Sequence, residues 1–540
     1  MKKYFYLLTA MALFAMNVQA QFTGGAGTEA EPYQVATAEQ LQAVSDFPTA
    51  SFVLTDDIDL SDIVWKPIAN FTGHFNGQGH TISNLTIESG EDGLGLFSRM
   101  NTPGVIENVV CRGFYIICNR WSGLLCGTNG NWEAKGGLIK NCYIYDSTLE
   151  GTEFIGGFSG VSGGSYENCY AVNVTIEGSG TAVGGITGNN EAGGHYWNCM
   201  FHGTIIGTTN TGGICAFYNG NCSVDNCFEN CVVYGNITSS GGTVGGIMGT
   251  PNWNVNNSNV INCAVFANVS GPGVGSIGGN AVRGKMIRNY ATGNVTATGI
   301  YYHDNWQDPW NGGLCSVNFN GPVEDCYFSG TIETNADDVK TAGILGRNWD
   351  GVAVRNCYYN ADGATQGMGD GDNPDLYDTN GMVPEDMLHL SNFKFSDMSK
   401  WQIVEGETTP FFANQTAPLK VTECTTTGIA GTGEAGLEKI FLIGSMSESI
   451  VKEAEIDGQS WNITFDEEEV VEGETLTVIG MGKDKMPSMV AKAKVESSTG
   501  IKNVNDNENV NNTVYDLQGR KINGNANHGI YIVNGKKILK

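Results

Sequence analysis

Positive charge is scarce in this sequence of 540 residues. It contains 29 Lys and Arg against 57 Asp and Glu, which gives a formal net charge of −28 at pH 7. A chain of this charge repels polyanions, so the composition argues against nucleic acid and acidic membrane surfaces as partners. Basic residues cluster in the body of the chain only at Arg283, Lys285 and Arg288. A lyase acting on uronic acids would need more positive charge than this.

The sequence beyond the first twenty residues also lacks long hydrophobic runs. Residues 1–20 have the pattern of a secretory signal peptide, with Lys2 and Lys3, an apolar run from Tyr4 to Met16, and small residues before a cleavage point near Ala20. No later apolar run is long enough to span a bilayer. We therefore predict an exported protein, secreted or on the outer-membrane surface, without a transmembrane segment.

Helical apolar stripes and standard catalytic motifs are both absent from the body of the chain. Between Gly93 and Tyr359 the apolar runs are short, rich in β-branched residues and bounded by Gly and Asn. The sequence contains no nucleophile elbow, phosphate-binding loop, metalloprotease helix or dinucleotide motif. These features predict β structure and give no direct sign of catalysis.

The sequence does contain a repeat of about thirty residues. One copy, Phe154–Gly178, joins a Gly-Gly-apolar-x-Gly segment to an Asn-Cys-aromatic segment. The second segment recurs at Asn141-Cys142, Asn168-Cys169, Asn198-Cys199, Asn226-Cys227, Asn262-Cys263, Asp325-Cys326 and Asn356-Cys357, with degenerate copies at Asn108 and Asn289. This period predicts an all-β chain built as a parallel β-helix of about nine to eleven coils, spaced about 4.8 Å apart.

The Asn-Cys pair predicts a sharp bend in each coil. Asn tolerates the left-handed backbone region, and stacked Asn amides form hydrogen bonds between coils. We therefore expect an Asn ladder at one corner, with the Cys side chains stacked inside it. Fifteen cysteines are present, and side-by-side Cβ vectors suit disulfides poorly, which favours buried thiols. Cys111–Cys118 and Cys222–Cys231 are the pairs that could be exceptions.

The repeat also carries a family resemblance. The pattern Gly-Gly-Ile-x-Gly followed by Asn-Cys-Tyr-Ala-x-Gly-Asn-Val, clearest at Gly245–Val269 and Arg288–Val295, resembles the GLUG-motif repeats of secreted bacterial surface proteins. The resemblance extends over Tyr33–Val421. It implies a right-handed parallel β-helix and a surface or adhesin-like role, but no particular chemistry.

The C-terminal end resembles a second family. Val514–Lys521 and Gly529–Lys540 are similar to the C-terminal sorting domain of the type 9 secretion system. That resemblance implies passage through the outer membrane, with export and sorting machinery as a partner. From the residues alone, Asn534-Gly535 predicts the turn of a β-hairpin.

Composition divides the chain into segments. The capping-box pattern Thr37–Gln40 predicts a short helix that covers the first coil, and Thr425–Gly436 has the composition of a linker. The predicted segments are a signal peptide (1–20), an N-terminal cap with entry coils (21–92), β-helix repeats (93–359), a C-terminal cap of the β-helix (360–421), a small β-sandwich-like domain (437–496) and a sorting-domain-like β tail (513–540).

Tryptophan recurs beside amides and carboxylates in the loops that follow the Gly-Gly segments. Because coils stack, we expect these loops to stack and to form a row of aromatic rings. Aromatic faces next to planar polar groups suit sugar rings. The candidate ligand-binding residues are Trp121, Trp132, Trp253, Trp306, Trp310 and Trp349. The alternative is that these rings pack a loop or cover the side of the β-helix.

An enzyme of this fold would need further features. Glycoside hydrolysis uses two carboxylates roughly 5–10 Å apart, and Glu133, Asp304, Asp308 and Asp350 are the residues that could supply them. No catalytic residue is otherwise predicted. Asp370, Asp372 and Asp375 offer oxygen ligands of the kind calcium takes, but they lack the EF-hand spacing, which favours a solvated loop without metal or cofactor.

The sequence thus favours an adhesin-like surface protein that binds extracellular glycan or host matrix. A β-helix glycan-degrading enzyme, a glycosidase rather than a polysaccharide lyase on charge grounds, is one alternative. A structural surface spacer is the other.

Overall fold

The computed structural model describes residues 21–220, 226–252, 254–255, 257–280, 282–303, 306–371, 373–443, 451–466 and 469–497, and the short strands at 502–503, 514–515, 530–533 and 536–539. The chain divides into two compact units. The first comprises Met1–Thr416 and Asp484–Pro487, and the second comprises Ala417–Lys483 and Ser488–Lys540. The predicted signal peptide lies outside the described residues.

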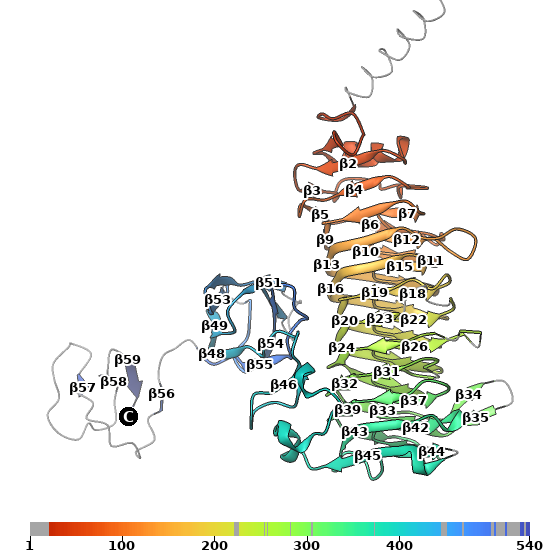
Figure 1. Cartoon of the computed structure of the whole chain (residues 1–540). Helices are drawn as coiled ribbons and strands as arrows, with labels where there is room; N and C mark the ends of the chain where they lie inside the picture. The colour runs from red at the N-terminus through yellow and green to blue at the C-terminus, as the bar shows by residue number, and fades with distance from the viewer. Residues whose placement is uncertain are drawn as a thin grey trace, which may run out of the picture. The chain divides into compact units, whose positions relative to one another are not determined.

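The first unit is a parallel β-solenoid of stacked coils (Figure 1). One ladder of strands, here called the first ladder, runs along it with each strand pairing in parallel with its equivalent on the next coil. Its members are β1 (Tyr33–Val35), β2 (Ser51–Leu54), β4 (His74–Asn76), β8 (Val105–Glu107), β13 (Leu138–Gly151), β16 (Ser165–Gly178), β19 (Tyr196–Trp197), β23 (Phe228–Glu229), β27 (Val260–Ile261), β31 (Met286–Ile287), β38 (Val323–Glu324), β43 (Val354–Asn360) and β45 (Tyr377–Met382). The predicted parallel β-helix is confirmed.

Two further ladders complete the wall of the solenoid. The long strands β13 and β16 run through all three ladders and pair with each other from Leu138↔Ser165 to Gly151↔Gly178. The second ladder continues through β3 (Ile58–Asp59), β5 (Thr81–Ser83), β9 (Val110–Arg112), β20 (Met200–Gly207), β24 (Val232–Ser239), β28 (Ala264–Val265), β32 (Tyr290–Ala291) and β39 (Tyr327–Phe328). The third includes β6 (Thr86–Glu88), β10 (Tyr115–Ile117), β29 (Asn268–Gly271), β33 (Val295–Ala297) and β40 (Ile332–Thr334).

A corner residue with positive φ separates the first ladder from the second. The residues at this corner are Asn108, Asn141, Asn168, Asn198, Asn230, Asn262, Arg288, Asp325 and Asn356, with φ between 50° and 56°. Asn side chains bond from coil to coil, as in Asn141 Nδ2 to Asn108 Oδ1 (3.2 Å) and Asn198 Nδ2 to Asn168 Oδ1 (2.7 Å). The expected Asn ladder is therefore present.

The corner differs from the sequence prediction in two coils. Phe228 pairs with Tyr196, so the corner of that coil is Asn230-Cys231 and not Asn226-Cys227. In the degenerate copy the corner is Arg288, whose Nε donates to Asn262 Oδ1 at 2.8 Å. Asn289 then takes the inward position that Cys occupies elsewhere, and its Nδ2 donates to the Val260 carbonyl.

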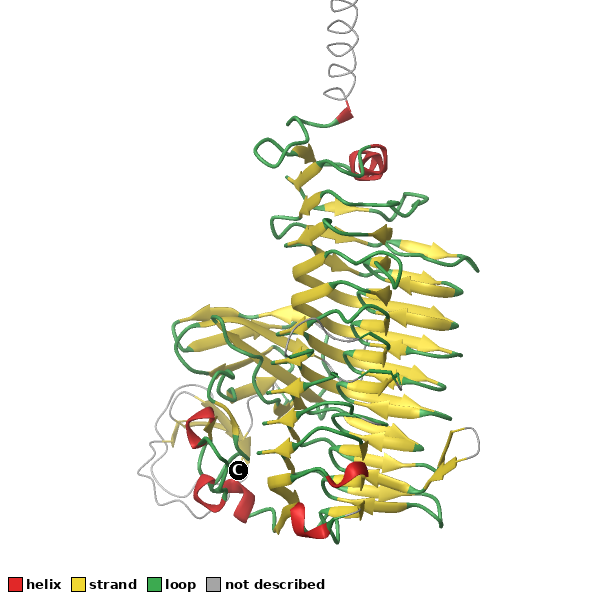
Figure 2. Ribbon diagram, turned by 45° about the vertical axis from the view of Figure 1, so that its right-hand side comes forward, coloured by secondary structure: helices red, strands yellow, loops and turns green. Residues whose placement is uncertain are grey.

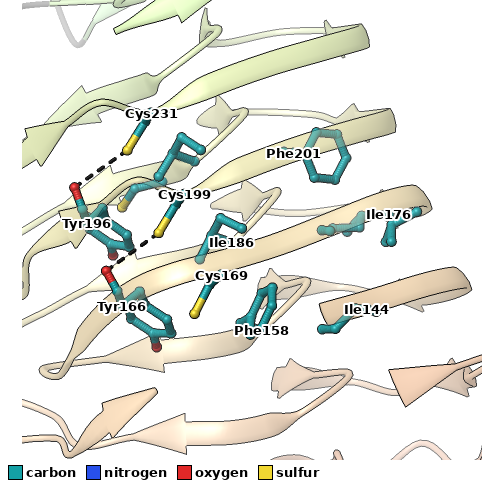
Figure 3. Packing of buried hydrophobic residues seen from close by; sticks show 14 of the residues in the cluster. Ile144, Phe158, Tyr166, Cys169, Ile176, Ile186, Tyr196, Cys199, Phe201 and Cys231 are labelled. Atoms are coloured by element: carbon teal, nitrogen blue, oxygen red, sulfur yellow. Dashed lines mark hydrogen bonds between the residues drawn. The ribbon is translucent and has the colours of Figure 1, made fainter. Parts of the chain in front are cut away.

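The cysteines next to these corners stack inside the solenoid (Figure 3). Their thiols donate to carbonyl oxygens one coil earlier, as in Cys199 Sγ to Tyr166 O and Cys231 Sγ to Tyr196 O, both at 3.5 Å. All fourteen cysteines of the described residues are free and buried, including Cys111 and Cys118. Cys222 lies outside the described residues. The thiols act as small core residues that also satisfy backbone oxygens.

Two parallel sheets formed by the Gly-Gly segments pack back to back. One contains β11 (Arg120–Gly123), β14 (Glu153–Gly156), β17 (Val183–Gly184), β21 (Thr211–Gly212), β25 (Thr243–Gly245) and β30 (Gly273–Gly275), and the other β7 (Phe97–Met100), β12 (Cys126–Asn129), β15 (Ser159–Ser162), β18 (Thr187–Asn190), β22 (Cys215–Tyr218) and β26 (Met248–Pro251). A methyl group on Gly156 would lie 2.4 Å from Ser159 O, and one on Gly160 2.3 Å from Ser122 N. Glycine is required here because the two backbones nearly touch. Phe158 and Ile186, at the turns between the sheets, are buried in the core (Figure 3).

A helix lies at the N-terminal end of the solenoid, and the segment after β45 packs on one of its sides. The helix α2 (Ala38–Ala43) lies at the N-terminal end (Figure 2), and its N-cap Thr37 accepts from Gln40 N at 3.3 Å, as the capping box predicts. The segment after β45 packs on outward-facing tyrosines of the second ladder. Tyr290 Oη donates to Gln415 Oε1 at 2.7 Å, and Lys394 N donates to Tyr358 Oη at 2.6 Å.

The second unit contains two four-stranded antiparallel sheets. They are formed by β48 (Lys420–Thr425), β49 (Gly428–Thr432), β53 (Ser460–Thr464) and β52 (Glu455–Asp457), and by β51 (Val451–Glu453), β50 (Leu437–Ile443), β54 (Thr475–Gly482) and β55 (Ala491–Lys494). The stretch predicted as a linker supplies β49 and part of β48, so a boundary at residue 437 is too late. Glycine is required at Gly431 within β49, because a methyl group there would lie 2.3 Å from Lys420 O and 2.4 Å from the ring of Trp461.

The C-terminal tail contains β56 (Lys502–Asn503), β57 (Val514–Tyr515), β58 (Ile530–Val533) and β59 (Lys536–Leu539). β58 and β59 pair in antiparallel fashion with Val533 opposite Lys536, the register that a two-residue turn requires. In the part of the chain that the structure describes, no helix is both long and apolar enough for a membrane crossing.

Candidate functional site

The candidate tryptophans occupy two positions of the coil and do not form one row. Trp121 and Trp310 each stand two residues before the glycine that ends the first strand of a Gly-Gly pair, in β11 and in β36 (Trp310–Gly312). Trp132 and Trp349 instead follow the second strand, β12 and β42 (Leu345–Asn348) respectively. Trp306 lies in an antiparallel hairpin of β34 (Tyr301–His303) and β35 (Trp306–Asp308), which projects from the solenoid (Figure 1).

Trp121 is 39% exposed and adopts the left-handed backbone region, with φ of 56°. The Arg120 guanidinium lies 4.3 Å from the centre of its ring. Arg120 is held in turn by Asp92, with Nε to Oδ2 at 2.9 Å, and by Glu153, with Nη1 to Oε1 at 3.8 Å. The result is a partly exposed ring beside fixed polar groups of both signs.

Trp132 is the most exposed of the described tryptophans, at 74%. Its backbone N–H donates to Glu191 Oε2 at 3.3 Å, and Glu191 Oε1 accepts from Asn189 Nδ2 at 3.1 Å. Asn131 Oδ1 accepts from the backbone of Glu133 and Ala134. These contacts hold the backbone of the loop, while the indole ring projects into solvent.

Trp310 and Trp349 are packed. Lys340 Nζ lies 5.3 Å from the centre of the Trp310 ring. The Trp349 ring stacks parallel to Phe319 at 5.8 Å, and the Arg347 guanidinium lies 5.5 Å from it. Both rings thus behave as loop-packing residues, which is the alternative considered from sequence. Trp253 and the side chain of Trp306 lie outside the described residues.

The candidate catalytic carboxylates do not converge. Asp308 is 1% exposed, accepts from Trp310 N at 3.0 Å and lies 3.6 Å from Arg347 Nη1. Burial raises the pKa of Asp308 despite the hydrogen bond from Trp310 and the Arg347 charge. Glu133 is exposed and lies six coil steps from the coil of Asp308, which is about 29 Å at 4.8 Å a step. That separation excludes a hydrolytic pair of these two residues.

The side chains of the other two catalytic candidates lie outside the part of the chain that the structure describes. Asp304 lies outside the described residues, and Asp350 is described only by its backbone, in the 3₁₀ turn Trp349–Gly351.

The calcium candidates are dispersed as well. Arg347 Nη2 lies 2.9 Å from Asp370 Oδ2, so that carboxylate already has a cationic partner. Asp375 is exposed in the 3₁₀ turn Pro374–Leu376, and Asp372 lies outside the described residues. Within the described ranges, no three His, Cys, Asp or Glu side chains are grouped so that they could hold a metal ion.

Trp197 is not one of the six candidate ligand-binding residues, although it is 37% exposed on the outer face of the first ladder. It pairs in register with Glu167 on one side and Glu229 on the other. The signal was alternation, since Tyr196 is fully buried in the core and its neighbour must therefore point outward.

Two curated proteins are similar to parts of the chain. Halomucin from Haloquadratum walsbyi is 36% identical over 163 residues, which are 26% of this chain and 2% of halomucin. A protein of Evansella cellulosilytica, whose name describes a Gly-rich membrane protein, is 32% identical over 123 residues, which are 20% of this chain and 14% of that protein. No family model and no solved structure matches the chain.

Proposed function

We propose that this chain is an exported, adhesin-like surface protein that binds extracellular glycan or host-matrix polymer through exposed tryptophans of the solenoid loops. The observation that carries the proposal is Trp132. It is 74% exposed, so its indole ring offers a large apolar face on which a sugar ring can pack. Glu191 holds its backbone, so the ring is presented on an ordered loop.

Trp121 adds a second contact of similar character. Its ring is already stacked on one guanidinium, and the carboxylates of Asp92 and Glu153 that hold Arg120 stand beside it. Sugar rings present apolar C–H surfaces and hydroxyl rims, which match an aromatic face bordered by charged hydrogen-bonding groups.

Surface location is supported by features outside the loops. Both relatives carry names of surface or membrane proteins, and the first residues have the pattern of a signal peptide. The GLUG-like repeats and the sorting-domain-like tail support export by the same route. The paired strands β58 and β59 are compatible with such a tail.

The test is a glycan and matrix-protein binding array probed with residues 21–540, read alongside mass spectrometry of released products. Binding without products, weakened about tenfold or more by Trp132→Ala, is the expected result. Val64→Ala is the matched control, because Val64 is 92% exposed and lies outside the loops that carry Trp121 and Trp132. Release of oligosaccharides would reject the adhesin function in favour of a hydrolase. Absence of both binding and products would favour a structural spacer.

A further inference from the structure

On the outer face of the first ladder, each coil contributes the residue that directly follows a buried core residue. In register along the solenoid these residues are Asn76, Glu107, Lys140, Glu167, Trp197, Glu229, Ile261, Ile287, Glu324 and Arg355. We call this row the outer row. Trp197 is its one aromatic member.

Trp197 stands between two carboxylates. β16, β19 and β23 stack on successive coils (Figure 1), with Glu167, Trp197 and Glu229 as Cα partners. Each step is about 4.8 Å, so the backbones of Glu167 and Glu229 lie about 10 Å apart with the indole between them. Tyr166, Tyr196 and Phe228 form a buried stack directly behind these three residues, with ring centres 5.3 and 5.0 Å apart.

The two carboxylates differ from the other acidic members of the outer row. Glu107 pairs with Lys140 at 2.9 Å, and Glu324 has Arg355 at 3.9 Å. The Glu167 side chain has neither a hydrogen bond nor an ion pair with any described residue, and among these residues the Glu229 carboxylate accepts only from the Asn226 amide, at 3.1 Å. Glu167 and Glu229 therefore keep most of their acceptor capacity for another molecule.

The Asn ladder is interrupted at the same place. It is continuous from Asn76 through Asn198, but the Asn198 and Asn230 side-chain oxygens have no hydrogen-bond partner among the described residues. These two residues directly follow Trp197 and Glu229. Both oxygens are buried, so they mark a break in the ladder behind the exposed ring and are not themselves contacts for a ligand.

We infer that Trp197, with Glu167 and Glu229, forms a second glycan-binding site, on the flat face of the solenoid, and that it takes a neutral sugar. The ring supplies the apolar contact, and the carboxylates accept hydrogen bonds from hydroxyl groups on either side of it. A uronate or sulfated sugar is disfavoured, because its charge would meet two carboxylates, and the Lys140 ammonium on the coil next to Glu167 is already paired with Glu107. A flat face, unlike a closed pocket, admits an internal unit of a long chain.

The inference goes beyond the loop tryptophans, because this site lies on a different strand ladder. The test uses residues 21–540 and isothermal titration calorimetry with neutral hexasaccharides of glucose, mannose and galactose, and with a hexagalacturonate as the charged probe. Trp197→Ala is expected to weaken binding of one neutral probe by about tenfold or more. Glu167→Gln is expected to weaken it less and to admit hexagalacturonate.

Ile206→Ala is the matched control, because Ile206 is an exposed residue (44%) of the same solenoid outside the outer row. Circular dichroism confirms that the variants are folded. If Trp197→Ala binds every neutral probe as wild type does, or if no neutral probe binds the wild type, the inference is overturned. If Trp197→Ala loses binding of the neutral probe and the double variant Trp121→Ala, Trp132→Ala does not, this site is supported and the loop site is rejected. The two proposals can therefore fail separately.

Discussion

Asn168 donates a hydrogen bond from Nδ2 to Oδ1 of Asn141, 2.9 Å away on the preceding coil. Both residues have positive φ, 51° and 52°. The same side chain that makes the bend tolerable therefore also ties one bend to the next. This double role explains why Asn, and not Gly, predominates at the corner.

Replacing that residue tests both roles. Asn168→Ala removes the two ladder hydrogen bonds and places a residue with a Cβ but no compensating amide at positive φ, so the free energy of unfolding should fall by about 2–4 kcal/mol. Asn168→Gly should cost less, because glycine adopts this φ readily. Asn226→Ala is the control, since Asn226 is not a corner residue. An equal fall in melting temperature for Asn168→Ala and Asn226→Ala would contradict the assigned register.

The back-to-back glycine sheets make a second prediction. In Gly156→Ala the new methyl group would meet Ser159 O and Gly188 N at 2.4 and 2.6 Å, and both are backbone atoms that cannot move aside cheaply. We expect a loss of about 3 kcal/mol or more, seen as a large drop in melting temperature or in soluble yield. Gly90 has no atom within 4 Å of such a methyl group, so Gly90→Ala should change stability by less than about 0.5 kcal/mol.

The buried thiols predict a loss of stability at high pH. Burial raises the pKa of Cys126 from its ordinary value of 9.0 to about 12, and that of Cys215 to about 11. Above pH 9 the unfolded chain releases these protons while the folded chain retains them, so stability is complete below about pH 9 and declines as pH rises toward the folded values. The melting temperature should fall between pH 9 and 11, less steeply in Cys126→Ala.

The same burial should slow the reaction of the cysteine thiols with thiol reagents. A thiol reagent added at pH 8 should modify the described cysteines only after the chain is unfolded, because all of them are buried and inaccessible in the folded state. Rapid reaction of several thiols in the native protein would show that the cysteine stack is open to solvent.

Glu107 predicts a pH effect of opposite sense. Burial raises its pKa, but the hydrogen bonds and charges of Lys140 and His74 outweigh this effect, and the net shift is downward from 4.5. Its contribution to stability is therefore present above about pH 4.5 and lost as the pH falls through the lowered value. At pH 7, Glu107→Gln should reduce the free energy of unfolding by about 1–3 kcal/mol and so lower the melting temperature. At pH 3 the reduction should be much smaller. Glu324→Gln, whose partner Arg355 is 3.9 Å away and more exposed, should be nearly neutral.

The period and the corner could be predicted from sequence because both depend on local residue types. Asn before Cys requires a bend followed by an inward small side chain, and the strand pairing repeats that requirement in every coil. The prediction went wrong where two Asn-Cys pairs stand four residues apart. Only the pairing of Phe228 with Tyr196 shows that Asn230, and not Asn226, is at the corner.

Exposure of tryptophan could not be predicted in the same way. Whether a loop ring is free depends on the residue stacked on it from the next coil, such as Phe319 beneath Trp349, and that neighbour lies about thirty residues away. Trp197 was not chosen as a candidate for a related reason, because its neighbours Glu167 and Glu229 lie one coil before it and one coil after it.

The register between coils also has a consequence for how such a chain can change its length. The strands of each coil pair with those of the coil before it and the coil after it, and β13 and β16 pair in register along their whole length. An in-frame duplication of one coil would therefore find matching partners on both sides and would extend the solenoid by about 4.8 Å. Recombination within the gene can therefore change the number of coils and of outer-row positions, because each added coil uses the same core residues as its neighbours.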